Sequence, residues 1–283
     1  MKSTLGFTLA LLAVLAVKTA AAAVQFSYAE EWQMWKTQHG KSYGSVREEL
    51  ERHLVWLANR EYINAHNQNS HIFGFTLAIN HLGDIGQCGA SYAFSAVGAL
   101  EGANALATGT LISLSEQNII DCSIPYGNHG CKGGNMYDAF LYMVANDGID
   151  TTNSYPFKAK QMSCSYTESG RGATTSGSVA IESGNENDLQ SAVAYIGPVA
   201  VAVDAQSNAF RYYSSGVYSN SRCSSTDITH AMVVTGYGTY NGKDYYLVKN
   251  SFGANWGMDG YILMARNKYN QCGIATDASY PTL

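Results

Sequence analysis

The 283-residue chain has few charged side chains and no excess of positive ones. Charged residues make up 14% of it, with 17 Lys and Arg against 22 Asp and Glu, and the formal net charge is −5. Proteins that bind nucleic acid normally carry a basic face, so this balance argues against a nucleic-acid partner. The apolar fraction of 46% is typical of a folded, soluble protein and excludes a largely disordered one.

The sequence also lacks the motifs of common cofactors. It contains no phosphate-binding loop, no dinucleotide fingerprint, no Cys-x-x-Cys pair and no clustered histidines. We therefore expect no cofactor and no metal. There is no Asn-x-Ser/Thr sequon, so N-glycosylation is not expected either.

Long apolar runs are missing except at the N-terminus. Lys2 precedes an apolar run from Leu5 to Val17, and the small residues Ala20 to Ala23 follow it. The run is too short to cross a bilayer comfortably, which favours a secretory signal peptide over residues 1–23. A retained membrane anchor is the alternative. No other stretch resembles a transmembrane segment, so we expect no membrane partner.

Six cysteines occur in this exported chain, and an even number there predicts three disulfides. Six cysteines allow 15 pairings, so the sequence alone leaves the connectivity open. The cysteines are Cys88, Cys122, Cys131, Cys164, Cys223 and Cys272.

The organisation along the chain predicts an α+β fold with two lobes. Residues 26–67 look helical. They are followed by a helix-compatible run from Gly89 to Ala105. A second helix is expected near Leu114–Gln117, with Ser115 as a plausible cap. Residues 130–135 read as a turn-rich loop. Short β-prone runs occur at 179–181, 199–203, 231–236, 245–249 and 260–264.

The strongest local signal runs from Gly86 to Ser95, with the sequence Gly-Gln-Cys-Gly-Ala-Ser-Tyr-Ala-Phe-Ser. His230 lies 139 residues after Ser91, and Asn250 follows 20 residues later. This segment and spacing resemble the nucleophile, base and orienting amide of papain-like cysteine proteases. On residues 46–67, one helical face resembles the signature of the cathepsin L-type inhibitory pro-segment; it carries Glu48, Arg52, Trp56, Asn59, Ile63 and Asn67.

The resemblance implies a two-lobed papain-like fold, with a helical lobe and a β-barrel-like lobe. It divides the chain into a signal peptide at 1–23, a helical pro-segment at 24–85 and a papain-like domain at 86–283. It also implies that the disulfides are Cys88–Cys131, Cys122–Cys164 and Cys223–Cys272.

Roles in the site follow from the same resemblance. Ser91 would be the nucleophile, His230 the general base and Asn250 the amide that holds the imidazole. Gln87 would donate to an oxyanion together with the Ser91 N–H. Gly133, Gly134, Met136 and Asp277 would line the substrate cleft. For His230 the alternative is a structural histidine, for Asn250 a turn residue, for Gln87 a surface residue and for Asp277 a solvated charge near the C-terminus.

One departure from the protease pattern decides the chemistry. A protease thiol loses its proton to histidine and waits as a thiolate, whereas the pKa of the Ser91 hydroxyl is far too high for that. Peptide cleavage should therefore be low. The site is either a dead protease or a hydroxyl–imidazole pair that attacks a more electrophilic centre.

The replacement Ala90-Ser91-Tyr92 and the C-terminal run from Asn267 to Pro281 resemble the silicateins, the silica-forming branch of the family. That resemblance implies an enzyme that hydrolyses and condenses silicon alkoxides or silicic acid, is secreted, and assembles into filaments within a mineral. A catalytically inactive scaffold and a weak protease or esterase are the alternatives.

Hydroxyl-bearing residues are dense between positions 212 and 226, where they are expected to template silanols or to form an ordinary solvated loop. They are Tyr212, Tyr213, Ser214, Ser215, Tyr218, Ser219, Ser221, Ser224, Ser225 and Thr226.

The link between pro-segment and nucleophile is short. Asp84-Ile85 runs directly into Gly86-Gln87, and two residues span at most about 7 Å. The family pattern implies a longer connection, which would contain the maturation site and the mature N-terminal strand. Either a skipped exon or incomplete gene record removed it, or this is an isoform with an uncleaved pro-segment.

Overall fold

The computed structural model describes residues 28–80 and 88–283. The chain divides into two compact units, Met1–Tyr62 and Ile63–Leu283. The expected signal peptide and Gln87 lie outside the described residues.

The first unit is helical and is held together by indole rings. Residues 28–38 form one helix, a turn follows, and α2 spans Val46–Asn67. Trp32, Trp35 and Trp56 are almost fully buried, and the Trp32 ring centroid lies 5.2 Å from that of Trp35 and 5.6 Å from that of Trp56. The region 26–67, which the sequence predicts to be helical, contains two helices within its described residues, and all six signature residues lie on α2.

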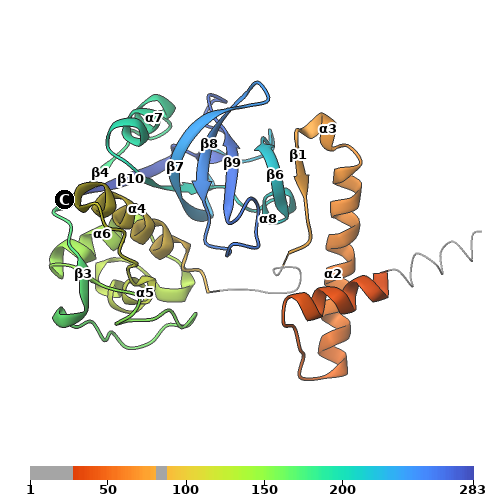
Figure 1. The fold of residues 1–283 in the computed structure, drawn as a ribbon, viewed down its shortest axis with the longest axis horizontal. Coiled ribbons are helices and arrows are strands. Elements are labelled where there is room, and N and C mark those ends of the chain that lie inside the picture. The colour runs from red at the N-terminus through yellow and green to blue at the C-terminus, as the bar shows by residue number, and fades with distance from the viewer. Residues whose placement is uncertain (1–27, 81–87) are drawn as a thin grey trace, which may run out of the picture. The chain divides into compact units, whose positions relative to one another are not determined.

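The second unit contains most of the helices and all the strands of the described chain (Figure 1). Its helices are α3 Ser70–Phe73, α4 Ser91–Thr108, α5 Glu116–Cys122, α6 Met136–Ala145, α7 Glu186–Tyr195 and α8 Asn208–Arg211. Its strands are β1 Phe75–Leu77, β2 Ile149–Asp150, β3 Arg171–Ala173, β4 Gly177–Ala180, β5 Val199–Val203, β6 Tyr213–Tyr218, β7 His230–Tyr240, β8 Lys243–Lys249, β9 Tyr261–Ala265 and β10 Asp277–Thr282. Short 3-10 turns include η2 Gly130–Lys132.

Eight strands form one sheet in the order β1-β6-β9-β8-β7-β5-β10-β4, and β2 and β3 form a separate pair. The β6–β9 pair is parallel and the other pairs are antiparallel. One hydrophobic core lies among the strands, and a second surrounds α4, α5 and α6. Figure 1 shows these helices gathered beside the sheet. The predicted α+β, two-lobed fold is confirmed.

Small residues allow α4 to pack closely on the sheet. A Cβ atom added at Gly98 would lie 3.0 Å from a methyl carbon of Val233 on β7, and one at Gly102 would lie 2.4 Å from Cγ of Pro198. Ser95, on the same face, donates a hydrogen bond of 2.5 Å to the carbonyl of Met232 on β7. The first residue of α4, Ser91, is therefore held at a fixed place against the strand that begins with His230.

The edge strand β1 was not expected from the sequence. It pairs antiparallel with β6, and the Asn67 side chain holds its end, because Asn67 Nδ2 donates to the Leu77 carbonyl at 2.7 Å and Asn67 Oδ1 accepts from the Leu77 N–H at 2.8 Å. Phe75 and Leu77 are buried in the core of the sheet lobe. The end of α2 and β1 are thus part of the second unit.

Candidate active site

Ser91 lies at the start of α4, in a segment that a disulfide holds in place. Cys88 is bonded to Cys131 of η2, and the Gly89 N–H donates to the Cys131 carbonyl at 2.9 Å. The first N–H groups of an α-helix have no acceptor within the helix. The N–H of Ser91 is therefore placed to bind developing negative charge, as the sequence predicts, whereas Gln87 lies outside the described residues.

His230 begins β7 and makes a short hydrogen bond to Asn250. Its Nε2 lies 2.7 Å from Asn250 Oδ1, which also accepts from the Ser251 N–H at 2.7 Å. An amide oxygen only accepts, so Nε2 carries the proton and Nδ1 is left with a free lone pair. Asn250 thus selects the tautomer in which Nδ1 is a base.

Aromatic side chains enclose this imidazole. The ring centroid of Phe252 lies 4.7 Å from that of His230, and the centroid of Phe210 lies 6.0 Å from it. Burial lowers the pKa of His230 from its ordinary value, and the hydrogen bond that the imidazole donates to Asn250 opposes that effect in part. The resting imidazole is therefore neutral at neutral pH.

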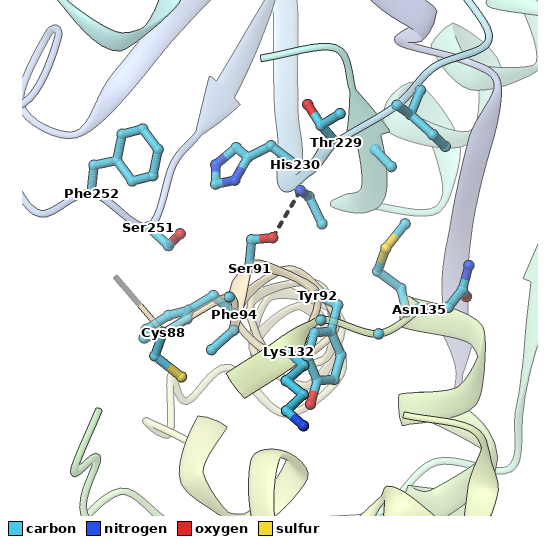
Figure 2. A pocket seen from close by; sticks show the side chains of 18 of the residues that line it. Cys88, Ser91, Tyr92, Phe94, Lys132, Asn135, Thr229, His230, Ser251 and Phe252 are labelled. Atoms are coloured by element: carbon cyan, nitrogen blue, oxygen red, sulfur yellow. Dashed lines mark hydrogen bonds between the residues drawn. The ribbon is translucent and has the colours of Figure 1, made fainter. Parts of the chain in front are cut away.

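Ser91 and His230 face the same cavity, as Figure 2 shows. The Ser91 Oγ atom accepts a hydrogen bond of 3.2 Å from the Ala231 N–H, and within the described residues it makes no hydrogen bond to His230. The hydroxyl and the imidazole are thus neighbours whose proton-transfer contact is not made in this state. Catalytic contacts are often long in the absence of a substrate.

The cavity has a volume of about 800 Å³ and is lined by both lobes. All four residues expected at the cleft, Gly133, Gly134, Met136 and Asp277, line it. Asp277 accepts a hydrogen bond of 2.8 Å from Asn135 Nδ2, and burial raises the pKa of its carboxyl while that hydrogen bond lowers it.

Sequence reasoning missed other wall residues. Phe94 packs edge-on against Phe157 with 5.1 Å between ring centroids, and Phe252 covers the base. Ala202 also faces the cleft. Phe94 and Phe252 adjoin the two motifs and could have been found there; Phe157 and Ala202 have no local signal, because only the fold brings them to the site.

Three disulfides are present, Cys88–Cys131, Cys122–Cys164 and Cys223–Cys272, and this is the predicted pairing. The described residues contain no group of three or more His, Cys, Asp or Glu side chains placed to hold a metal ion. Among the helices of the same residues, none combines the length and apolarity that a membrane span requires.

The hydroxyl-rich segment is only in part a surface feature. Tyr212, Tyr213 and Tyr218 are each 1% exposed and belong to the core of the sheet lobe. The Tyr213 hydroxyl donates to the Gly216 carbonyl at 2.7 Å. The expectation that all these hydroxyls face solvent is wrong for the three tyrosines. Exposed hydroxyls remain at Ser215, Ser221, Ser225 and Thr226.

Sequence families match both parts of the chain. The papain family cysteine protease profile matches residues 75–282, and the cathepsin propeptide inhibitor domain profile matches residues 32–87. This chain has disulfides and is similar to a cathepsin L, which indicates a secreted or lysosomal protein.

Individual relatives agree with these matches. The chain is 43% identical to a silicatein from Petrosia ficiformis over 317 residues, covering 89% of this chain and 94% of that protein. It is 40% identical to a cathepsin L from Sarcophaga peregrina over 314 residues, covering 90% and 93%. Both alignments exceed 283 residues because each relative carries residues without a counterpart here.

Solved structures place the fold in the same group. The structure of a digestive procathepsin L 3 from the larval midgut of Tenebrio molitor superimposes with a TM-score of 0.87 at 38% identity, covering 90% of this chain and 99% of that one. A recombinant stem bromelain precursor gives 0.84 at 31% identity, covering 91% and 99%. With its cathepsin-type pro-segment and its similarity to a silicatein, the chain belongs to the papain family of cysteine proteases.

Proposed function

We propose that this protein is a silica-polymerising enzyme in which Ser91, His230 and Asn250 hydrolyse and condense silicon alkoxides or silicic acid. The observation that carries the proposal is that a serine hydroxyl and a neutral imidazole with a free Nδ1 face the same cavity. The 43% identity to a silicatein supports the same function.

The physical argument concerns the reactivity of the Ser91 hydroxyl, which stands where a cysteine protease has a thiol. A hydroxyl does not form a resting ion pair with imidazole, so its proton must move during the attack. Amide carbonyls are poor electrophiles for such a nucleophile. Silicon expands its coordination and accepts attack by weaker nucleophiles, so the same pair suffices for a silicon centre.

The reaction follows from the atoms present. A rotation about χ1 of Ser91 exchanges the Ala231 N–H for Nδ1 of His230. Ser91 Oγ then bonds to silicon while its proton passes to Nδ1, and the leaving alkoxide takes that proton and departs as alcohol. A silanol next attacks the silicon, its proton passes to Nδ1 and on to Ser91 Oγ, and an Si–O–Si bond forms.

Burial of the site supports this proton path. Because Asn250 holds Nε2–H, the imidazole cannot turn to present a protonated nitrogen to the nucleophile. The Phe252 ring packs against the imidazole, with 4.7 Å between the ring centroids. Secretion, filament assembly and location inside a mineral belong to the same proposal and rest on the similarity to the silicatein.

A scaffold function is the second candidate, because the Ser91 hydroxyl bonds to Ala231 and not to His230. Substitution of Ser91 by Ala separates the two functions. We expect Ser91→Ala to reduce the rate of ethanol release from tetraethoxysilane, and of silica formation, by at least about 100-fold. Ser113→Ala, an exposed hydroxyl outside the cleft, is the matched control.

Silica formation by Ser91→Ala at the wild-type rate would remove the serine from the mechanism and leave the scaffold. Turnover of an activated ester by the wild type, with little cleavage of a peptide amide, would show that the hydroxyl is nucleophilic.

A further inference from the structure

Three lysines lie on one rim of the cleft, and the proposed reaction uses none of them. Lys132 belongs to η2 and lines the cavity, and Lys158 and Lys160 flank Ala159, which also lines it. All three lysine side chains are exposed. None of them forms an ion pair with an Asp or Glu of the described residues. We call these three residues the lysine rim.

Packing joins the two segments that carry the lysine rim. A Cβ atom added at Gly130 of η2 would lie 2.2 Å from Oε1 of Gln161, so the loop that follows Phe157 lies directly against η2. The Phe157 ring packs on that of Phe94 in the first turn of α4, with 5.1 Å between the ring centroids. Both segments therefore lie beside the start of the helix that carries the nucleophile.

Buried groups of α5 hold the backbone of this loop. Gln117 is fully buried; its side chain accepts from the Lys158 N–H at 2.8 Å and donates to the Lys160 carbonyl at 2.8 Å. The disulfide Cys122–Cys164 ties the loop to the end of α5. Because the main chain is held on its inner side, the two exposed lysine side chains extend into solvent from fixed positions.

The disulfide that holds the nucleophile segment also holds Lys132. Lys132 follows Cys131, whose Cα atom lies 4.6 Å from that of Cys88, and Ser91 is three residues after Cys88. Figure 2 shows Lys132 and Cys88 on one side of Ser91 and His230 on the other. A ligand that contains several linked silicon centres is long enough to reach both Ser91 and the lysine rim.

The sequence around the lysine rim contains no acidic residue. Segments 123–135 and 155–167 have no Asp or Glu. Of the acids on adjoining elements, Asp121 is only 4% exposed, and Asp138 and Asp277 belong to α6 and β10. In a chain with a formal net charge of −5, the rim is thus a local patch of positive charge. Such a patch at a cleft raises the local concentration of anionic ligands.

Silicon chemistry supplies an anion that fits this patch. Monomeric silicic acid is neutral at neutral pH, but silanols become more acidic as silicic acid condenses, so oligomers carry negative charge. Each lysine ammonium group offers three hydrogen-bond donors to such oxygens, and charge-assisted hydrogen bonds are the stronger kind. Tetraethoxysilane carries no charge. The patch therefore distinguishes a growing silicate from a neutral silicon donor.

We propose that the lysine rim binds an oligosilicate anion, and that this anion accepts the silicon carried by Ser91. A protonated silanol of the bound oligomer attacks the silicon, and its proton passes through Nδ1 of His230 to Ser91 Oγ. The bond between silicon and Ser91 Oγ breaks, and an Si–O–Si bond forms. The ionised silanolates of the same oligomer stay at the lysines. The acceptor role rests on the proposed function, whereas the anion site does not.

Binding is measured in the Ser91→Ala background, in which Ser91 transfers no silicon. The probe is freshly neutralised sodium silicate, which contains oligosilicates, and the measurement is calorimetry. Combined Lys132→Gln, Lys158→Gln and Lys160→Gln should weaken binding at least about tenfold, and Arg at the same three positions should preserve it. The difference should vanish in 1 M NaCl, where the screening length is about 3 Å.

A matched control makes the same change in net charge elsewhere. It replaces by Gln three exposed cations that do not line the cavity, and its oligosilicate binding should stay within about twofold of that of the parent. The three cations are Arg222, Lys243 and Lys268.

Turnover separates the acceptor step from the donor step. With tetraethoxysilane alone, ethanol release by the triple Gln variant of the rim should stay within about twofold of the wild-type rate, because this donor is neutral. With oligosilicate added, the wild type should form Si–O–Si bonds about tenfold faster than the variant, or more. Each rate is corrected with Ser91→Ala, since silicate also condenses spontaneously.

Equal binding and equal condensation by the wild type and the triple Gln variant of the rim would overturn the anion site, and so would an equal loss of binding in the control. Absence of ethanol release by the wild type would instead overturn the proposed function and leave the binding result standing. A sulfated hexasaccharide tests the other source of polyanions. Its weaker binding supports a silicate ligand, and its tighter binding would overturn the assigned partner.

Discussion

At the scale of the residue, the state of His230 sets the pH at which the proposed enzyme works. The base must be neutral, and burial lowers its pKa below the ordinary 6.5. We therefore expect the rate to stay nearly constant as the pH falls through 6.5 and to drop only at lower pH. A pH profile of alkoxide hydrolysis measures this, and an acid limb centred above 6.5 would contradict the neutral, buried imidazole.

A second titrating residue affects stability. Glu116 begins α5, and burial raises the pKa of its carboxyl from 4.5 to about 7. As the pH rises from 4.5 to 7 the unfolded chain loses this proton before the folded one, so the free energy of unfolding falls; above 7 the loss is complete. Glu116→Gln should stabilise the protein by about 1–3 kcal/mol at pH 8 and change little at pH 4.

Thermal unfolding at the two pH values checks this prediction. Glu168→Gln, at an exposed carboxyl, is the control. The same gain at both pH values would mean that ionisation of Glu116 is not the cause.

At the scale of the element, the end of α2 and β1 depend on one side chain. Asn67 satisfies both backbone groups of Leu77, so Asn67→Ala leaves a donor and an acceptor unpaired beside a buried strand. We expect a loss of about 1–3 kcal/mol in the free energy of unfolding, measured by urea titration. Asn69→Ala, at an exposed side chain, should cost much less; equal losses would contradict the role of Asn67.

Local patterns predicted some elements and not others. The apolar run at β5 was found with its observed bounds, Val199–Val203, because every residue in it is buried. The cap at Ser115 was also found, and Ser115 Oγ accepts from the Asn118 N–H at 2.9 Å. By contrast, β6 looked like a hydroxylated loop, because its strand alternation is set by neighbours on β1 and β9 that are distant in sequence.

In the candidate site too, local motifs predicted some features and missed others. Motifs predicted Ser91, His230 and Asn250 as site residues. Nothing local indicated that the Ser91 hydroxyl would bond to the Ala231 N–H, since that contact joins residues 140 positions apart. Sequence spacing likewise left the disulfide pairing among 15 possibilities. The family resemblance, and not composition or periodicity, supplied the pairing that the structure confirms.

At the scale of the whole molecule, the site depends on how a helix docks on a sheet. Ser91 belongs to α4 and His230 to β7, so their separation follows the packing between the two elements. At Gly102 an added Cβ would lie 2.4 Å from Pro198 Cγ. Gly102→Val should therefore shift the far end of α4, cost about 1–3 kcal/mol in stability, and lower the silica rate more than stability loss explains.

Ala107→Val, at an exposed position on the same helix, is the control. The comparison is made well below the unfolding temperature, where both variants are folded. A folded Gly102→Val enzyme with the full wild-type rate would show that the docking of α4 tolerates displacement.

The absence of side-chain bulk along one face of α4 also bears on how activity is lost under random mutation. A screen for non-producing clones that still yield folded protein should return glycine codons about two to three turns of helix away from the nucleophile, alongside the obvious hits. Such clones would carry an intact serine, histidine and asparagine. Their defect would be a displaced helix, which moves the serine away from the histidine on the sheet.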